Sequence, residues 1–223
     1  MRCFQDIFDS ADEKLRLDYI DSKYYNLVCG FDTNVTYLMW LIWNNKYSLV
    51  EKLIARYDDE QKLKQIINMS TLKYKLTALH IISELCNSGS DNIKYKIAKL
   101  LIDKGADVNA KDSGGNTALH LMVSGDFIPI KMIKLLIKAG VDVNAEDNSN
   151  TTALFCTTSV LGDNNHIKAS ILLVEAGADI KKMCYKSDHH DVIFMSFLGY
   201  IKYEKDKMNK KIEFETKFLK KRK

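Results

Sequence analysis

The residues best suited to chemistry in this chain are its histidines and cysteines. Cys184, Asp188, His189 and His190 form the one cluster of residue types that bind metals. A zinc site needs ligand pairs at matching spacings, and this cluster has no second pair, so we assign it a structural or solvent-exposed role. The five cysteines are odd in number and form no Cys-x-x-Cys pair. This pattern argues against disulfides and favours buried, reduced thiols.

His80 and His120 each end the sequence Thr-Ala-Leu-His. A catalytic imidazole needs a nucleophile or an acid spaced as its partner, and neither histidine has one. The sequence also has no phosphate-binding glycine loop, dinucleotide fingerprint, His-Glu-x-x-His motif or nucleophile elbow. We therefore expect a protein that is not an enzyme and uses no cofactor, metal ion or small-molecule substrate.

A repeated pair of elements must position these residues. Thr36, Thr77, Thr117 and Thr152 begin four units, spaced 41, 40 and 35 residues apart. Each threonine precedes a short apolar segment, and a second segment follows in which Ile, Leu and Val recur every three or four residues. This spacing predicts an amphipathic helix. One helix-loop-helix unit cannot cover its own apolar face, so the units must stack.

Turn-forming residues separate the units. Gly105, Gly140 and Gly177 each follow the last apolar position of a helix, where a left-handed residue closes the final turn. The segment 112–116 predicts a tight turn that projects sideways. Pro129 fits the first turn of an outer helix, where its missing N–H does no harm.

These residues carry a resemblance to a known family. DSGGNTALHLMVSG (112–125) and IKMIKLLIKAGVDVNAED (130–147) resemble the ankyrin repeat, whose first helix starts with Asp-x-x-Gly-x-Thr-Pro-Leu-His and whose second ends with Leu-Leu-x-x-Gly-Ala-Asp-x-Asn-Ala. Alanine stands at the family's proline position in three units. The resemblance implies an all-α ankyrin-repeat solenoid of stacked helix-loop-helix units with short hairpin-like connecting turns. It also implies that His80 and His120 tie neighbouring turns together by hydrogen bonds.

The same alignment predicts the organisation of the chain. We expect an N-terminal helical cap over residues 1–34 and four repeats over 35–183, at about 35–69, 72–110, 112–146 and 147–181. Residues 184–223 align as a degenerate C-terminal repeat or cap with a basic tail. The fourth unit has Asn150 and Phe155 where the third has Gly115 and His120. We expect Asn150 to adopt the left-handed conformation and the fourth unit to pack less regularly.

Charge is concentrated at the C-terminus. The net charge is +4, but residues 202–223 hold ten Lys/Arg against four Asp/Glu, so this tail is +6 and the remainder −2. Basic behaviour is therefore expected of the tail rather than the body. Clustered cations fit nucleic-acid contact or nuclear targeting. We favour a solvated helix face, because acids intervene and aromatic residues do not alternate with the cations as in single-strand binding.

The apolar run 37–43 is far shorter than the roughly 20 residues of a membrane span. We therefore expect no membrane contact. We also expect a monomer, located in the cytoplasm, with the nucleus as the alternative. The irregular repeat lengths and the composition, rich in Lys, Ile and Asn, resemble those of ankyrin proteins of large DNA viruses, poxviruses especially, or of intracellular bacteria. The viral resemblance implies the host cytoplasm.

The ankyrin resemblance implies a module that binds a protein partner through hairpin tips and inner helices. Trp43 is the best single anchor there, because an exposed Trp supplies a large contact area. The viral resemblance implies a modulator that sequesters a host signalling protein, as inhibitor-of-NF-κB-like proteins do. The alternative is a ubiquitin-ligase adaptor, although no F-box-like segment is evident. The predicted contact positions are Trp43, Asn44, Lys73, Tyr74, Leu76, Glu84, Ser113, Gly114, Asn116, Ser124, Asn148, Ser149, Thr151 and Ser159.

Two asparagines are candidate modification sites. Asn109 and Asn144 each follow a leucine by eight residues and Asp-Val directly. This context is similar to that of ankyrin asparagines modified by the oxygen-sensing asparaginyl hydroxylase of animals. The alternative, which we favour, is that both asparagines only cap a turn.

Overall fold

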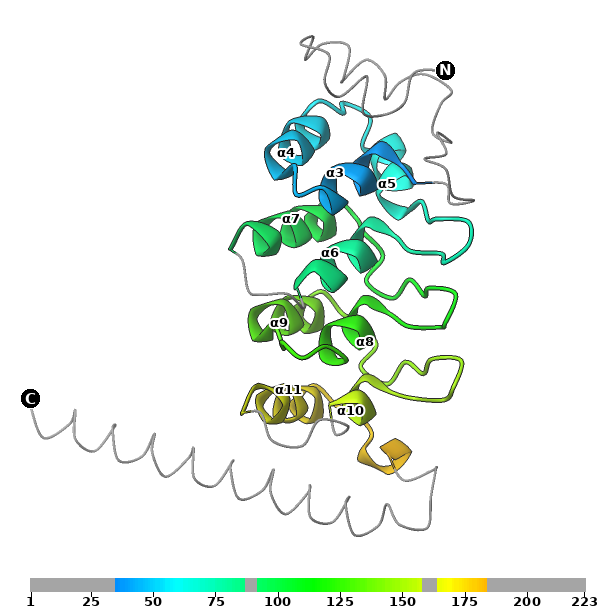
Figure 1. The fold of residues 1–223 in the computed structure, drawn as a ribbon, viewed down its shortest axis with the longest axis vertical. Helices are drawn as coiled ribbons and strands as arrows, with labels where there is room; N and C mark the ends of the chain where they lie inside the picture. Colours follow the sequence, from blue (N-terminus) through cyan, green and yellow to red (C-terminus); the bar gives the residue numbers. More distant parts are fainter. Residues whose placement is uncertain (1–34, 87–91, 158–163, 184–223) are drawn as a thin grey trace, which may run out of the picture.

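The computed structural model describes residues 35–86, 92–157 and 164–183 of the 223-residue chain. Paired helices stack in two columns in these ranges (Figure 1). The inner column consists of α3 (Tyr37–Trp43), α6 (Ala78–Cys86), α8 (Ala118–Val123) and α10 (Ala153–Cys156). The outer column consists of α4 (Tyr47–Ala55), α7 (Asn92–Asp103), α9 (Ile130–Lys138) and α11 (Asn164–Glu175).

The described residues contain no strand. Their one pairing of extended backbone is an isolated antiparallel bridge between Glu146 and Thr152. A 3-10 helix, η1 (Ile180–Met183), follows α11. The predicted fold class, an all-α solenoid, is confirmed for this part of the chain.

One continuous apolar core runs through both columns. Each inner helix packs on the next inner helix, and each outer helix packs on the next outer helix. The inner helices are buried almost all round, whereas an outer helix such as α9 buries one stripe, formed by Met132, Ile133 and Leu136. The units stack as predicted, so that each covers the apolar face of the next. The outer helices turn their polar faces to solvent.

The repeated threonines start the inner helices. Thr36 Oγ1 accepts a hydrogen bond from Met39 N at 3.2 Å, and Thr152 Oγ1 accepts one from Phe155 N at 3.3 Å. Such bonds satisfy N–H groups that have no partner within the helix. Thr-x-Leu therefore recurs because every inner helix needs the same first turn.

The glycines end the outer helices as predicted. Gly105, Gly140 and Gly177 have φ values of 91°, 84° and 94°. The residue after each glycine donates its N–H back to the buried leucine five positions earlier, as Ala106 does to the Leu101 carbonyl at 2.9 Å. A side chain at these φ values would be strained, so glycine is favoured.

Pro129 lies one residue earlier than expected. It is the N-cap of α9 rather than a residue of its first turn. Its carbonyl accepts hydrogen bonds from Met132 N at 2.8 Å and Ile133 N at 3.1 Å. The proline ring still does not destabilise the helix, because the helix does not use the N–H group of its N-cap residue.

One helix was not predicted from the sequence: α5 (Glu60–Asn68). It lies between α4 and the turn segment 69–77 that leads to α6, which we call the second hairpin. The Asp59 carboxylate caps it by accepting from Gln61 N at 2.9 Å and Lys62 N at 3.0 Å. Its apolar side chains, Leu63, Ile66 and Ile67, are buried. The signal was present as an acidic cap followed by apolar residues at steps of three and four.

The hairpins project to one side of the stack, opposite the outer helices (Figure 1). In the third unit Asp112 N donates to the Asn116 carbonyl at 2.9 Å, and Asp112 Oδ1 accepts from Gly114 N at 2.8 Å. In the fourth unit Asp147 N donates to the Thr151 carbonyl at 2.9 Å. The predicted sideways turn is confirmed.

The fourth unit departs from the third as its sequence suggested. Asn150 has a φ of 57°, which confirms its left-handed conformation. The inner helix α10 has four residues against six in α8, and Phe155 is half-buried against the core. Imidazole replacement by a phenyl ring thus exchanges a hydrogen bond for packing.

Cys86 is buried and Cys156 half-buried, both as free thiols. Burial raises the pKa of the Cys156 thiol to about 11, so it stays protonated at neutral pH. Several expectations lie outside the described residues: the caps over 1–34 and 184–223, the Cys184, Asp188, His189 and His190 cluster, and the state of Cys3 and Cys29.

Candidate interaction surface

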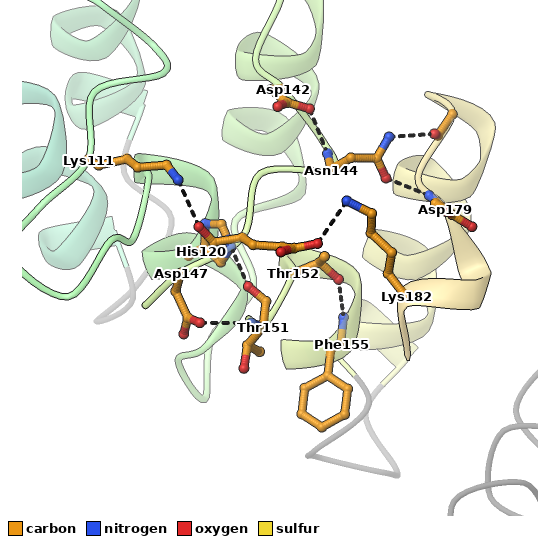
Figure 2. Close-up of polar contacts among 12 residues, drawn as sticks. Lys111, His120, Asp142, Asn144, Asp147, Thr151, Thr152, Phe155, Asp179 and Lys182 are labelled. Atoms are coloured by element: carbon orange, nitrogen blue, oxygen red, sulfur yellow. Dashed lines mark hydrogen bonds and ion pairs between the residues drawn. The ribbon is translucent and has the colours of Figure 1, made fainter. Parts of the chain in front are cut away.

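Two buried histidines each join the inner helix of one unit to the hairpin of the next unit. His120 Nδ1 accepts the Thr117 N–H at 3.2 Å, and Nε2 lies 3.1 Å from the Thr151 carbonyl oxygen (Figure 2). A carbonyl can only accept, so Nε2 carries the hydrogen and the ring is neutral. His80 Nε2 contacts the Asn116 carbonyl in the same way at 3.1 Å. The predicted role of both imidazoles is confirmed.

Burial lowers the pKa of both imidazoles below the ordinary 6.5. Their backbone hydrogen bonds act in the opposite direction but are the smaller effect. Protonation would also remove the Nδ1 acceptor that binds the threonine N–H. The geometry is that of a structural joint that requires neutral rings.

A second set of bonds, which we call the asparagine ladder, joins successive units beside the histidines. It consists of Asn68, Asn109 and Asn144. Asn144 Nδ2 donates to the Gly177 carbonyl at 3.0 Å, and its Oδ1 accepts from Asp179 N at 2.6 Å (Figure 2). Asn109 bridges Gly140 and Asp142 in the same way. The two candidate modification sites therefore use their amides between units, and their hydroxylation stays a prediction.

Asn68, the last residue of α5, completes the ladder. Its Nδ2 donates to the Gly105 carbonyl at 2.8 Å, and its Oδ1 accepts from Asp107 N at 2.7 Å. Its role was not predicted, because Asn68 lies in Ile-Ile-Asn-Met rather than in Asp-Val-Asn-Ala. Asn68 therefore resembles Asn109 and Asn144 in its position in the stack but not in its local sequence.

Backbone bonds hold the hairpin tips in register. Ser113 N donates to the Tyr74 carbonyl at 2.8 Å, and Asn148 N donates to the Gly114 carbonyl at 2.9 Å. Asn148 Nδ2 adds a bond to the Ser113 carbonyl at 2.9 Å. The three tips therefore form one continuous, preorganised surface.

A hydrogen bond and an ion pair, both to Glu146, reinforce the last described joint. Lys111 Nζ donates to the Glu146 carbonyl at 2.8 Å, and Lys182 Nζ lies 2.8 Å from Glu146 Oε1 (Figure 2). The hydrogen bond with Glu146 raises the pKa of Lys182. Both pairs are solvent-exposed, so we expect them to contribute little to stability.

The predicted contact positions divide into two groups. Asn116 and Thr151 support the hairpins, since their carbonyls accept from the histidines, and they are half-buried with Leu76 and Gly114. Ser159 lies outside the described residues. The solvent-exposed positions are Trp43, Asn44, Lys73, Tyr74, Glu84, Ser113, Ser124, Asn148 and Ser149.

The largest apolar exposure is at the second hairpin and the end of α3. Trp43 is 54% exposed and Tyr74 48%, and Leu72, which was not among the predicted contact positions, is 65% exposed. Lys73 Nζ lies 5.0 Å from the Tyr74 ring centroid, within cation-π range. Burial, with Asp112 nearby, raises the pKa of Glu84 on α6.

Metal-binding side chains do not gather in the described part of the chain. Among these residues, no group of three or more His, Cys, Asp or Glu side chains could hold a metal ion. No helix in the same ranges has the length and apolar character needed to cross a membrane.

Stacked helix pairs, glycine-closed helix ends and laterally bonded hairpins define a helical-repeat solenoid. Comparison with known proteins gives the family. Residues 90–184 match the family described as ankyrin repeats, in three copies. A stretch of 107 residues is 36% identical to ankyrin repeat protein L122 of Acanthamoeba polyphaga mimivirus. Residues 90–184 of this chain are therefore similar to ankyrin repeats.

The mimivirus match is local. It covers 45% of this chain and 15% of the viral protein, so the chain corresponds to a small part of that relative's length. Ankyrin repeats over these residues suggest a module for protein–protein interaction.

Proposed function

We propose that this chain binds a protein partner through its hairpin face, which we define as the hairpin tips together with the exposed ends of the inner helices. One observation carries the proposal. The described residues expose four large apolar side chains: Leu72 and Tyr74 in the second hairpin, Trp43 at the end of α3 and Ile93 on α7. Aromatic side chains of this kind are the usual anchors of protein interfaces.

The polar residues of the hairpin face are suited to binding specificity. Ser113, Asn148 and Ser149 are small, exposed and held by the bonds between tips. Preorganised groups lose little freedom on binding, which favours affinity without new contacts. We therefore infer that the second hairpin and α3 supply most of the binding energy and that the later hairpins supply specificity.

We propose further that the partner is a host signalling protein, sequestered in the host cytoplasm by a viral or microbial ankyrin protein. The similarity to a mimivirus protein supports the viral setting. An inhibitor-of-NF-κB-like mechanism, in which binding alone blocks the partner, requires no second domain. Ligase recruitment, the alternative, would require a further segment that binds the ligase.

The test compares the full chain with a Trp43→Ala, Tyr74→Ala variant in affinity purification from amoebal and animal lysates. Quantitative mass spectrometry identifies partners, and calorimetry then measures each affinity. Loss of two anchors should weaken binding by at least about tenfold, which corresponds to about 1.4 kcal/mol.

Ile93→Ala is the matched control, because Ile93 is a 47% exposed apolar residue on the outer helix α7. It should bind the partner as the unchanged chain does. Equal binding by the double variant, or no partner enriched by the unchanged chain, would contradict the proposal.

A further inference from the structure

The outer helices of the last three described units carry a one-sided set of charges. Together α7, α9 and α11 contain seven lysines and two acids, Asp103 and Glu175. Lys94 is half-buried and donates to the Leu85 carbonyl at 2.9 Å. The other six lysines are solvent-exposed and form what we call the lysine face: Lys96, Lys99, Lys131, Lys134, Lys138 and Lys168.

The repeat aligns these lysines across helices. Lys96, Lys131 and Lys168 each lie five residues before a buried leucine of their own helix. Because α9 packs against both α7 and α11, these amines form a row along the solenoid, with helix axes about 10 Å apart. Within α9, Lys134 and Lys138 follow Lys131 at steps of three and four and share its side of the helix. The result is a two-dimensional array of cations.

Most described acids of the same units lie elsewhere, the exceptions being Asp103 and Glu175. Of the seven acids in residues 92–157, only Asp103 lies on an outer helix, where it pairs with Lys99. Asp126 lies between α8 and α9, and the other five lie in the hairpin segments. The hairpins project away from the outer helices (Figure 1). The described part of the body therefore carries a cationic face that its net charge conceals.

The composition of the lysine face identifies the partner it fits. Protein interfaces are depleted in lysine and depend on aromatic anchors, and the lysine face contains none. Stable membrane attachment takes a second signal besides basic residues, and the apolar stripes of α7 and α9 are used in the core. Single-stranded nucleic acid requires aromatic side chains for base stacking. Phosphate contacts from lysines alone are enough for non-specific binding to a duplex.

We propose that the lysine face binds the phosphate backbone of duplex nucleic acid without sequence preference. This activity lies on the opposite side of the stack from the hairpin face and is independent of partner binding there. The amines replace condensed counterions at the phosphates, and release of those ions drives the association.

The test measures binding of the full chain to a short fluorescent DNA duplex by anisotropy, between about 50 and about 200 mM salt. A Lys131→Gln, Lys134→Gln, Lys138→Gln variant removes the centre of the array. The slope of log Kobs against log salt should become shallower by about 2 to 3, since each lost contact contributes about 0.9. The corresponding triple arginine variant should keep the slope.

The matched control is Lys64→Gln, Lys73→Gln, Lys75→Gln, which removes three exposed charges outside the array and should keep the slope. A tail variant with residues 220–223 changed to glutamine separates the tail's contribution. Circular dichroism establishes that each variant is folded.

Four results would overturn the proposal: no duplex binding at the lowest salt, an unchanged slope in the lysine-face variant, an equal loss in the control, or tighter binding to phosphatidylserine vesicles or an acidic peptide than to duplex. Full loss in the tail variant with none in the lysine-face variant would assign the binding to the tail instead.

Discussion

Single side chains determine how this solenoid is joined. His80 and His120 are buried, and each must keep one tautomer, because Nδ1 accepts a threonine N–H while Nε2 donates to a carbonyl of the next hairpin. Phe155 occupies the equivalent position in the fourth unit, and its phenyl ring has no nitrogen to protonate. The joints of the second and third units should therefore respond to pH.

We predict that stability falls as pH is lowered from about 7.5 to about 5.5. Burial lowers the folded-state pKa of both histidines below 6.5, so the unfolded chain binds protons that the folded chain excludes. The stabilisation is present above the unfolded-state value and is lost below it, at no more than about 1.4 kcal/mol per pH unit for each histidine. Urea unfolding across this range measures the effect.

The matched variant is His80→Phe, His120→Phe, which introduces at both positions the residue that the fourth unit already has at Phe155. It should unfold with a flatter dependence on pH, whatever its absolute stability. An unchanged chain that is equally stable at both ends of the range would contradict the assignment of neutral rings.

Two glycines with the same backbone conformation should differ in their tolerance of alanine. Gly115 and Gly140 have φ values of 79° and 84°, so a side chain is strained at either. At Gly115 an added Cβ would also lie 2.5 Å from Asn148 Oδ1 and 2.7 Å from Asn148 N, whereas at Gly140 it meets nothing within 4 Å. We expect Gly140→Ala to cost about 1 kcal/mol and Gly115→Ala about 2 to 4 kcal/mol. Equal losses in urea unfolding would show that the clash is relieved.

At the scale of elements, α5 fastens the first unit to the second. Its buried side chains pack on the stack, and its last residue begins the asparagine ladder. Asn68→Ala removes the bonds to Gly105 and Asp107. We predict a loss of about 1 to 2 kcal/mol in unfolding free energy and faster hydrogen exchange at the Asp107 amide.

Asn44→Ala provides the control for this element. The side-chain amide of Asn44 donates to the Trp40 carbonyl in its own helix, at 2.9 Å, and is exposed. Its loss should change stability by a few tenths of a kcal/mol. If Asp107 exchanges at the same rate in Asn68→Ala as in the unchanged chain, the ladder does not couple α5 to the second unit.

For the molecule as a whole, the helices that pack most closely in the described ranges belong to one unit or to neighbouring units, so damage should spread locally. Leu119 lies in α8, between α6 and α10, and is fully buried. Leu119→Ala should cost about 2 to 5 kcal/mol and reduce exchange protection in both flanking inner helices.

Leu38→Ala makes the same chemical change in α3, whose inner neighbour is α6. It should lower protection in α6 while α10 keeps its own. Hydrogen exchange measured by mass spectrometry distinguishes these patterns. Equal loss in α10 from both variants would mean that the stack unfolds as one cooperative unit.

Features that depend on neighbouring residues could be predicted from the order of the amino acids alone. Threonine starts an inner helix, glycine closes an outer one, and Asp112 closes its hairpin, because each bond spans only a few residues. The stacking followed too, since an unpaired apolar face needs a cover. The hydrogen-bonding role of the histidines was predicted from the resemblance to the ankyrin repeat.

Which distant residues meet, and which surfaces remain exposed, depends on how the units stack in three dimensions. Asn68 takes its place in the ladder because α5 brings it to a hairpin almost forty residues away. The exposure of Trp43 and Leu72 and the alignment of the lysine face likewise arise from stacking one unit on the next. Such contacts depend on the relative placement of whole units, which no short stretch of sequence encodes.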